Sequence, residues 1–415
     1  MKSNTFIYLA CALLFFTSPA LQAQSNEQEF QQVIVDSMYS QTLGENRDFW
    51  VRLPDNYQPN SDQKYAVIYL LDGFSLKSDL EAVYNNYWGH YLPHMILVGI
   101  SNRENRTRDL TTSQVQNRRG SAMNSETGGA AAFATFIEKE LIPTIDNQYP
   151  TLDYRTLIGH SYGGLFTLNM LVNYSHVFKN FIAIDPSLDW DNQKLLTQAK
   201  AQLALADYSG KSLFVSLAAE QLHMYNQDIT MDNIMSDRSE FTLFARSIID
   251  FCNTVTAHSK NGLNFSWKVY PEDLHGTVPL PSIRDGLVAI FNWYQFKSPQ
   301  KYNNPETPIQ EISELLKTQE AIYTTHFGVP TPPMVEELLN GYGYMYLQMG
   351  MPDKAFMFFE LNITHYPKSA NAYDSMAEYY ESQNDKANAL INLKKALSIS
   401  GSDYYKERIQ ALTND

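Results

Sequence analysis

Apolar and polar residues follow each other along the chain in a pattern that predicts alternating strands and helices. Continuous apolar runs, typical of buried parallel strands, occupy residues 65–74 and 95–101, and a short apolar run lies at 156–158. Further strands, separated by helical stretches, are expected at 181–185, 212–218 and 265–271. Between Gly128 and Tyr149 the apolar residues recur every three or four positions, which predicts a helix packed on a sheet. Within residues 24–62, alternating runs predict an edge hairpin. This order predicts an α/β domain with a mainly parallel sheet covered on both faces.

The chain beyond this domain changes character at residues 297–308, a segment rich in proline and asparagine. A helix is expected at about 309–323, and a second break follows at 328–333. After it, similar residues recur 34 positions apart, which is the tetratricopeptide period: Gly343 and Ala377, Tyr346 and Tyr380, Gly350 and Asn384, Ala355 and Ala389, Pro367 and Gly401. We therefore predict a catalytic domain at 24–298, a linker and supporting helix at 299–333, and a small all-α tetratricopeptide-like domain at 334–415.

The first 23 residues have the features of a secretory signal peptide. A single basic residue precedes an apolar core from Phe6 to Phe16, and small residues surround Ala23. Cleavage there leaves Cys252 as the one cysteine, so no internal disulfide is expected and the core must hold the fold. We expect an exported protein, periplasmic or secreted, with no membrane span. A net charge of −14 without basic runs argues against nucleic acid as a partner.

One stretch carries the strongest chemical signal. Residues 156–171 read as the end of a strand, then Gly159-His160-Ser161-Tyr162-Gly163, then a helix. This is the context of a nucleophile elbow, in which a serine on a strained turn exposes its hydroxyl above the sheet edge. The sequence predicts Ser161 as a catalytic nucleophile.

A serine hydroxyl needs a base, and the base needs a third group that orients it. His275 is the expected base, because it follows directly on a strand at the edge where Ser161 lies. Glu220, at the end of the preceding strand, is the expected acid. Asp228, Glu272 and Asp273 are alternatives, as is a serine–histidine dyad without a dedicated acid.

The developing oxyanion requires two backbone N–H donors. Tyr162, directly after the nucleophile, should supply one, and Phe74 the other, with Gly73 allowing the turn. No cofactor and no metal are expected, since the sequence shows no cluster of His and Asp residues with metal-ligand spacing.

Seven segments, in order along the chain, resemble the putative esterase (esterase D-like) family of α/β-hydrolases: LGENRDFWVRLPDNY, YAVIYLLDG, VGISNRENRTRDLT, GGAAAFATFIEKELIPTID, RTLIGHSYGGLF, AIDPSLDWDN and EDLHGTVPLPSIRDGL. The resemblance covers about residues 35–297. It implies an α/β-hydrolase fold, Ser161 as nucleophile, His275 as base and an acid at Glu220. It also makes Arg106 and Arg108 candidate contacts for an anionic or catecholate substrate, against the alternative of a solvated loop or a salt bridge to Asp109.

The leading hypothesis is a serine carboxylesterase that hydrolyses a small-molecule ester of siderophore or plant-carbohydrate type. Acyl transfer to a sugar or lipid acceptor is a second hypothesis. A third is an inactive hydrolase scaffold whose repeat tail binds a protein partner. The aromatic-rich segment 84–94 could stack an aryl acyl group, although packing is the favoured interpretation.

Overall fold

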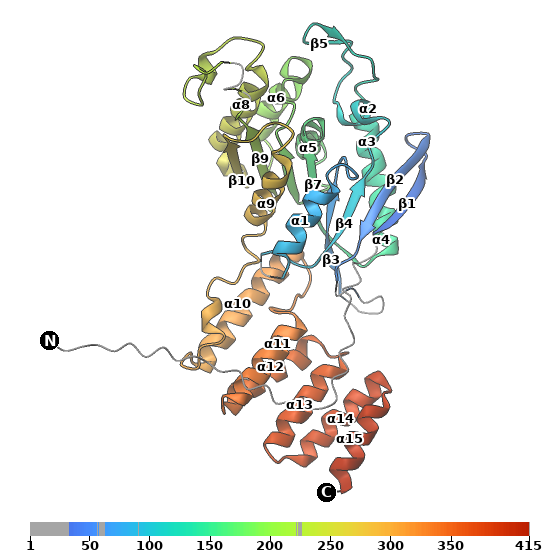
Figure 1. The fold of residues 1–415 in the computed structure, drawn as a ribbon, viewed down its shortest axis with the longest axis vertical. Coiled ribbons are helices and arrows are strands. Elements are labelled where there is room, and N and C mark those ends of the chain that lie inside the picture. The colour runs from blue at the N-terminus through green and yellow to red at the C-terminus, as the bar shows by residue number, and fades with distance from the viewer. Residues whose placement is uncertain are drawn as a thin grey trace, which may run out of the picture.

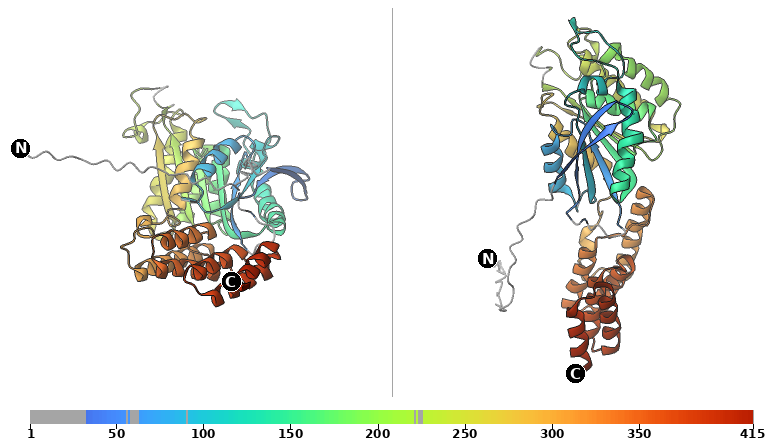
Figure 2. Two further views of the ribbon diagram at one scale, coloured as in Figure 1. Left: turned by 60° about the horizontal axis from the view of Figure 1, so that its bottom comes forward. Right: turned by 90° about the vertical axis from the view of Figure 1, so that its right-hand side faces the viewer.

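The computed structural model describes residues 33–55, 57, 63–89, 91–220, 222 and 226–414. The predicted signal peptide therefore lies outside the described residues. Figure 1 shows an α/β domain joined through one long helix to an all-helical tail, and the right-hand view of Figure 2 shows that the molecule is elongated.

An eight-stranded sheet forms the centre of the α/β domain, in the order β1-β2-β4-β3-β7-β8-β9-β10. Only the β1–β2 and β2–β4 pairs in this sheet are antiparallel, which confirms the mainly parallel sheet and the edge hairpin. The strands are β1 Ile34–Ser40, β2 Glu45–Arg52, β3 Tyr65–Leu70, β4 Met95–Ile100, β7 Thr151–His160, β8 Asn180–Ile184, β9 Ser212–Ala218 and β10 Asn264–Tyr270. A separate small hairpin consists of β5 (Asn117–Arg118) and β6 (Ser121–Ala122).

Helices cover both faces of the sheet, as the pattern predicted. One apolar cluster joins the sheet to α3 (Ala130–Phe136), the π-helical turn η1 (Ile137–Leu141), α4 (Ile142–Gln148), α5 (Tyr162–Asn173), α6 (Trp190–Leu203) and α8 (Leu243–Ala257). A second cluster joins the other face to α1 (Lys77–Tyr87) and α9 (Pro279–Ile290). The predicted helix at Gly128–Tyr149 is thus the continuous run of α3, η1 and α4. The short helix α2 (Arg106–Leu110) carries both Arg106 and Arg108.

Helix α10 (Ile309–Phe327) connects the domain to the tail and contributes to the cores of both. Its Tyr323 and Phe327 belong to the second cluster of the α/β domain, whereas Ile312 and Leu316 pack with the tail. The indole of Trp293 stacks on His326, with ring centroids 3.9 Å apart. The linker region is therefore part of the packed structure.

The tail consists of α11 (Glu336–Gln348), α12 (Pro352–His365), α13 (Ala370–Ser382), α14 (Lys386–Ser400) and α15 (Asp403–Asn414). Helix α13 begins 34 residues after α11, and α14 begins 34 residues after α12. A Cβ atom on Gly343 would lie 2.5 Å from the ring of Phe359, so a small residue is required where α11 and α12 meet. No helix in the described part of the chain is long and apolar enough to cross a membrane.

Candidate active site

Ser161 occupies the turn between β7 and α5 in a strained backbone conformation. Its φ of 60° and ψ of −114° are rare for a residue with a side chain. Backbone hydrogen bonds hold this turn: Ser161 N–H donates to Ile184 O at 2.9 Å, and Ser187 N–H donates to Ser161 O at 3.0 Å. The Oγ atoms of Ser161 and Ser187 are 3.4 Å apart. The strand, turn and helix predicted around Ser161 are confirmed.

Two glycines allow the chain to make this turn. A Cβ atom on Gly159 would lie 2.3 Å from Gly163 O, because the first turn of α5 folds back over the end of β7. A Cβ atom on Gly164 would lie 2.9 Å from Ile184 O. Side chains at either position would separate α5 from the strands that support it.

His275 lies in the turn after β10, where its ring is held by a buried carboxylate. Its Nδ1 is 2.6 Å from Oδ2 of Asp185, a residue that is 0% exposed. The other oxygen, Asp185 Oδ1, accepts from Ala218 N–H at 3.1 Å. Burial raises the pKa of Asp185, and the hydrogen bond from His275 partly offsets this effect. With Nδ1–H donating to Asp185, Nε2 is left as a proton acceptor.

The expectation that Glu220 orients His275 is wrong, because the carboxylate in that position belongs to Asp185. Glu220 follows β9 but is partly exposed, and its backbone N–H donates to Asp273 O at 3.2 Å. Asp185 follows β8, which lies between β7 and β9. Its positive φ of 43° turns the chain immediately after the strand. The sequence held one signal for it, an apolar strand that ends in Asp-Pro.

A second histidine, His160, packs against His275. The ring centroids are 4.5 Å apart, and Phe244 contacts His275 edge-on at 5.6 Å. Burial, together with the charges of His275 and Arg106, lowers the pKa of His160 to about 3. His160 is therefore neutral at ordinary pH and adds no positive charge beside His275.

The two predicted oxyanion donors have backbone amides available for a ligand. Tyr162 is the first residue of α5, where amides lack an acceptor within the helix. Gly73 N–H donates to Ile100 O and Ser75 N–H to Asp72 O. Among the described residues, no acceptor is recorded for the amide of Phe74. The positive end of the α5 dipole also favours negative charge here.

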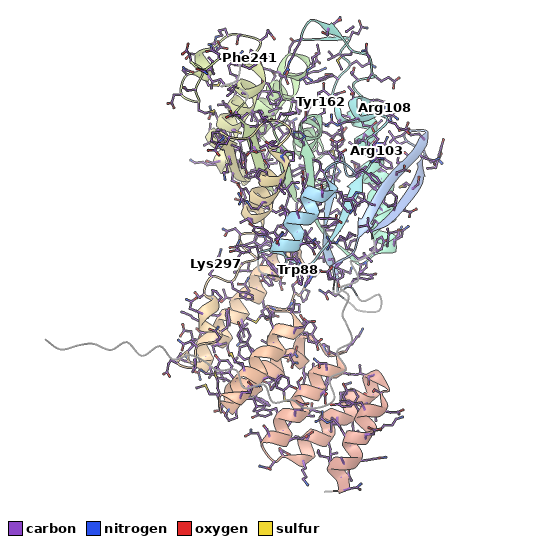
Figure 3. All side chains as sticks on the ribbon, in the orientation of Figure 1. Trp88, Arg103, Arg108, Tyr162, Phe241 and Lys297 are labelled. Atoms are coloured by element: carbon purple, nitrogen blue, oxygen red, sulfur yellow. The ribbon has the colours of Figure 1, made fainter. Side chains whose placement is uncertain are left out.

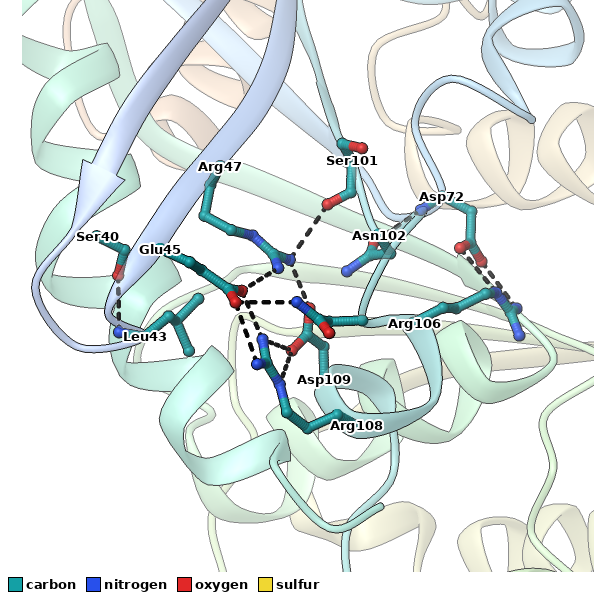
Figure 4. A network of polar contacts seen from close by, with 11 residues as sticks. Ser40, Leu43, Glu45, Arg47, Asp72, Ser101, Asn102, Arg106, Arg108 and Asp109 are labelled. Atoms are coloured by element: carbon teal, nitrogen blue, oxygen red, sulfur yellow. Dashed lines mark hydrogen bonds and ion pairs between the residues drawn. The ribbon is translucent and has the colours of Figure 1, made fainter. Parts of the chain in front are cut away.

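Arg106 and Arg108 both form ion pairs with carboxylates (Figure 4). Arg106 donates from Nε and one terminal nitrogen to Asp72, with both distances 2.8 Å, and its guanidinium lies 5.5 Å from the centre of the Tyr162 ring. Arg108 pairs with Glu45 at 2.6 Å and with the buried Asp109 at 2.8 Å. Arg108 is thus part of a structural ion-pair network, and Arg106 connects the Asp72 turn to Tyr162.

The β5–β6 hairpin brings two more arginines beside Tyr162. Arg118 donates to the Tyr162 hydroxyl and to both oxygens of Asp189 at 2.9 and 2.8 Å, and Arg119 donates to the same carboxylate at 2.8 Å. The sequence did not single out these residues. In Figure 1 the hairpin stands above the end of the sheet at which α5 begins.

The aromatic-rich segment 84–94 lies away from the nucleophile. Figure 3 shows Trp88 near α10, at the opposite end of the domain from Tyr162. Trp88 packs against His94 there, with ring centroids 4.9 Å apart, and Tyr84 is buried. The described residues of this segment pack within the domain, as the favoured interpretation expected.

The chain is similar to proteins of known activity. Residues 40–224 match the family model described as Putative esterase. A ferri-bacillibactin esterase of Bacillus subtilis is 30% identical over 206 residues, which cover 46% of this chain and 71% of that protein. An enterobactin esterase of Emericella nidulans is 29% identical, over 42% of this chain and 60% of the relative.

Solved structures share the fold of this chain. An IroE-like serine hydrolase of Shewanella oneidensis has a TM-score of 0.65 and 26% identity, covering 80% of this chain and 99% of that one. A protein of Capnocytophaga ochracea, at 20% identity and a TM-score of 0.57, covers 92% of this chain and so shares a fold that includes helices of the tail. The chain therefore belongs to the Putative esterase family and is a carboxylic ester hydrolase.

Proposed function

We propose that the protein is a serine carboxylesterase in which Ser161 is the nucleophile, His275 the general base and Asp185 the acid that orients it. The observation that carries this proposal is the strained Ser161 turn, held by the segment that also supplies Asp185 to His275. One short segment, residues 184–187, thus supports both the nucleophile and the base.

In the proposed reaction, Ser161 Oγ attacks the ester carbonyl carbon while its proton passes to His275 Nε2. The amides of Tyr162 and Phe74 bind the resulting oxyanion. His275 then gives the proton to the leaving alcohol, and an acyl-enzyme remains on Ser161. Water, activated by the same histidine, releases the acid and restores the serine.

The proposed substrate is a siderophore ester in the space outside the cytoplasm. The names of three relatives support siderophore esters as the substrate class. These relatives are named as esterases of ferri-bacillibactin, enterobactin and triacetylfusarinine C. The signal-peptide pattern predicted for residues 1–23 supports this location. Determining the N-terminal sequence of the protein from its native cell tests the signal, since a mature chain that starts with Met1 would contradict export.

We further propose that the tail is tetratricopeptide-like. The 34-residue spacing of helix starts agrees with the spacing of similar residues in the sequence. We also propose that the tail binds a protein partner. A pull-down with the full-length chain tests this hypothesis, and a chain that ends after residue 333 is the control.

The test of the esterase combines labelling with turnover. A fluorophosphonate probe should label the wild-type protein once, at Ser161, and mass spectrometry of the labelled peptide locates the adduct. Ser161→Ala should lose both labelling and hydrolysis of p-nitrophenyl butyrate and of a catecholate siderophore. Turnover that survives in Ser161→Ala would exclude the proposed nucleophile. Product partitioning that depends on added acceptor alcohols would favour acyl transfer over plain hydrolysis.

A further inference from the structure

A cavity of about 340 Å³ opens next to Phe74, one of the two proposed oxyanion donors. Among its lining residues are Phe74 and His160, which are the proposed oxyanion donor and the immediate neighbour of Ser161. Asp72, Asn102, Arg103 and Arg106 line the same cavity. An ester whose oxyanion is bound by the Phe74 amide would place its attached groups beside this cavity.

The charged residues of the cavity leave one positive charge without a partner. Asp72 and Arg106 neutralise each other through two 2.8 Å hydrogen bonds. His160 is neutral because its pKa is lowered to about 3. Arg103 is exposed, and within the described ranges no carboxylate forms an ion pair with it. The lining therefore carries a net charge of +1, from one acid and two arginines.

Arg103 is held in position by an aromatic ring. Its guanidinium carbon lies 5.0 Å from the centre of the Phe74 ring, a distance at which cation–π attraction is effective. Figure 3 shows Arg103 on the same part of the domain as Tyr162 and Arg108. A planar guanidinium can bind an anion through two parallel N–H groups while its face contacts an aromatic ring.

We propose that this cavity is a subsite for an anionic group of the substrate or product, such as a carboxylate or an ionised phenol, and that Arg103 determines the preference for it. This proposal rests on the proposed esterase function and deepens it. Arg108 does not have this role, because Glu45 and Asp109 occupy its guanidinium. Arg106 has a positioning role, because Asp72 occupies it.

The test compares two probes of similar shape and different charge, 2,3-dihydroxybenzoate and 2,3-dihydroxybenzamide. Isothermal titration calorimetry with the Ser161→Ala protein measures binding without any turnover, so its outcome is independent of whether the esterase proposal holds. We expect the anion to bind more tightly than the amide, and Arg103→Gln to reduce this preference about fivefold to tenfold. Because Arg103 is exposed, the preference should also shrink between low and high NaCl concentrations.

Two variants serve as matched controls that each remove one positive charge. Lys406→Gln lies in α15 at the far end of the tail, and Lys200→Gln lies on α6 of the α/β domain, where it pairs with Asp250. Both should keep the wild-type preference. The proposal is overturned if the protein shows no preference for the anion, if Arg103→Gln retains it, or if Lys200→Gln loses it instead.

A turnover measurement separates this proposal from the esterase assignment. The ratio of kcat/KM for mono-p-nitrophenyl succinate to that for p-nitrophenyl butyrate should fall in Arg103→Gln and not in Lys406→Gln. Failure of the wild-type protein to hydrolyse either ester would count against the esterase and leave the calorimetric result to decide the subsite. Hydrolysis of both with an unchanged ratio would contradict the subsite alone.

Discussion

The carboxylate of Asp185 lies 2.6 Å from Nδ1 of His275, although 90 residues separate the two along the chain. Asp185 is fully buried and also accepts the amide of Ala218, so its position is fixed from two sides. A histidine held in this way is restricted to one tautomer and one ring orientation, as a general base requires.

Replacement of this carboxylate by an amide should impair catalysis severely. In Asp185→Asn the amide oxygen can still accept from Ala218 N–H, but the NH₂ group then faces His275 Nδ1 and favours the tautomer that is protonated on Nε2. That tautomer cannot accept the Ser161 proton. We expect kcat for p-nitrophenyl butyrate to fall about 10²- to 10⁴-fold, measured by steady-state kinetics.

Glu220→Gln is the matched control, because it removes the same charge from the segment that follows the neighbouring strand β9. It should retain nearly wild-type kcat, since Glu220 does not contact His275. A large loss in Glu220→Gln together with a small one in Asp185→Asn would reverse the assignment of the acid.

The same substitution should change how stability depends on pH. Because burial raises the pKa of Asp185, the folded chain binds a proton there that the unfolded chain has already released. The free energy of unfolding contributed by this group therefore falls as pH rises from the unfolded pKa toward the folded one, and then levels off. Asp185→Asn carries no charge to desolvate and should gain stability relative to wild type over this acidic interval.

Urea unfolding at several pH values between about 4 and 7 measures this difference. Asp403→Asn, at an exposed position in α15, controls for the general effect of removing one acidic charge. A difference between Asp185→Asn and wild type that does not change with pH would contradict the role of burial.

Arg106 and Arg108 are two positions apart and should respond differently to the same change. Arg106→Gln releases Asp72 and the turn that leads to Phe74, so we expect kcat to fall about 10- to 100-fold with little change in KM for a neutral ester. Arg108→Gln removes one of two cations from the buried Asp109 and should instead lower the free energy of unfolding by about 1–3 kcal/mol.

Kinetics and urea unfolding on both variants distinguish the two roles. Arg106→Lys keeps the charge but cannot form the two parallel hydrogen bonds to Asp72, so it should restore little activity. If Arg106→Gln raised KM for neutral and anionic esters without lowering kcat, Arg106 would be a substrate contact, as the sequence first suggested.

The sequence was most informative where local pattern and spacing decide the structure. The apolar runs predicted the parallel strands, and the glycines around Ser161 predicted its turn, because these features depend on neighbouring residues. The acid could not be predicted in the same way. Asp185 and Glu220 both follow parallel strands at one edge of the sheet, and only the path of the chain after each strand decides which carboxylate reaches His275.

The carboxylate partners of the arginines could not be predicted for a related reason. Arg106 meets Asp72, and Arg108 meets Glu45, which are 34 and 63 residues away along the chain. The sequence showed three arginines in a polar segment. It did not indicate which of them form ion pairs with carboxylates. The sequence also gave no indication that the β5–β6 hairpin lies over Tyr162, because short polar segments have no periodicity.

The connection through α10 predicts that the α/β domain depends on a residue outside it. Phe327 packs edge-on against Tyr154 and Trp293, with ring centroids 5.4 and 5.2 Å away, in the cluster that contains β7. Phe327→Ala should lower the free energy of unfolding by about 3–5 kcal/mol, because it leaves a cavity beneath the strand that carries Ser161. Ile391→Ala, at a position 63% exposed on α14, is the control and should change stability by less than about 0.5 kcal/mol.

The decisive measurement is the temperature at which esterase activity is lost, compared with the temperature at which the helices melt, followed by circular dichroism. If Phe327→Ala lowered the helical transition and left the inactivation temperature of the esterase unchanged, α10 would belong energetically to the tail and not to the domain that holds the active site.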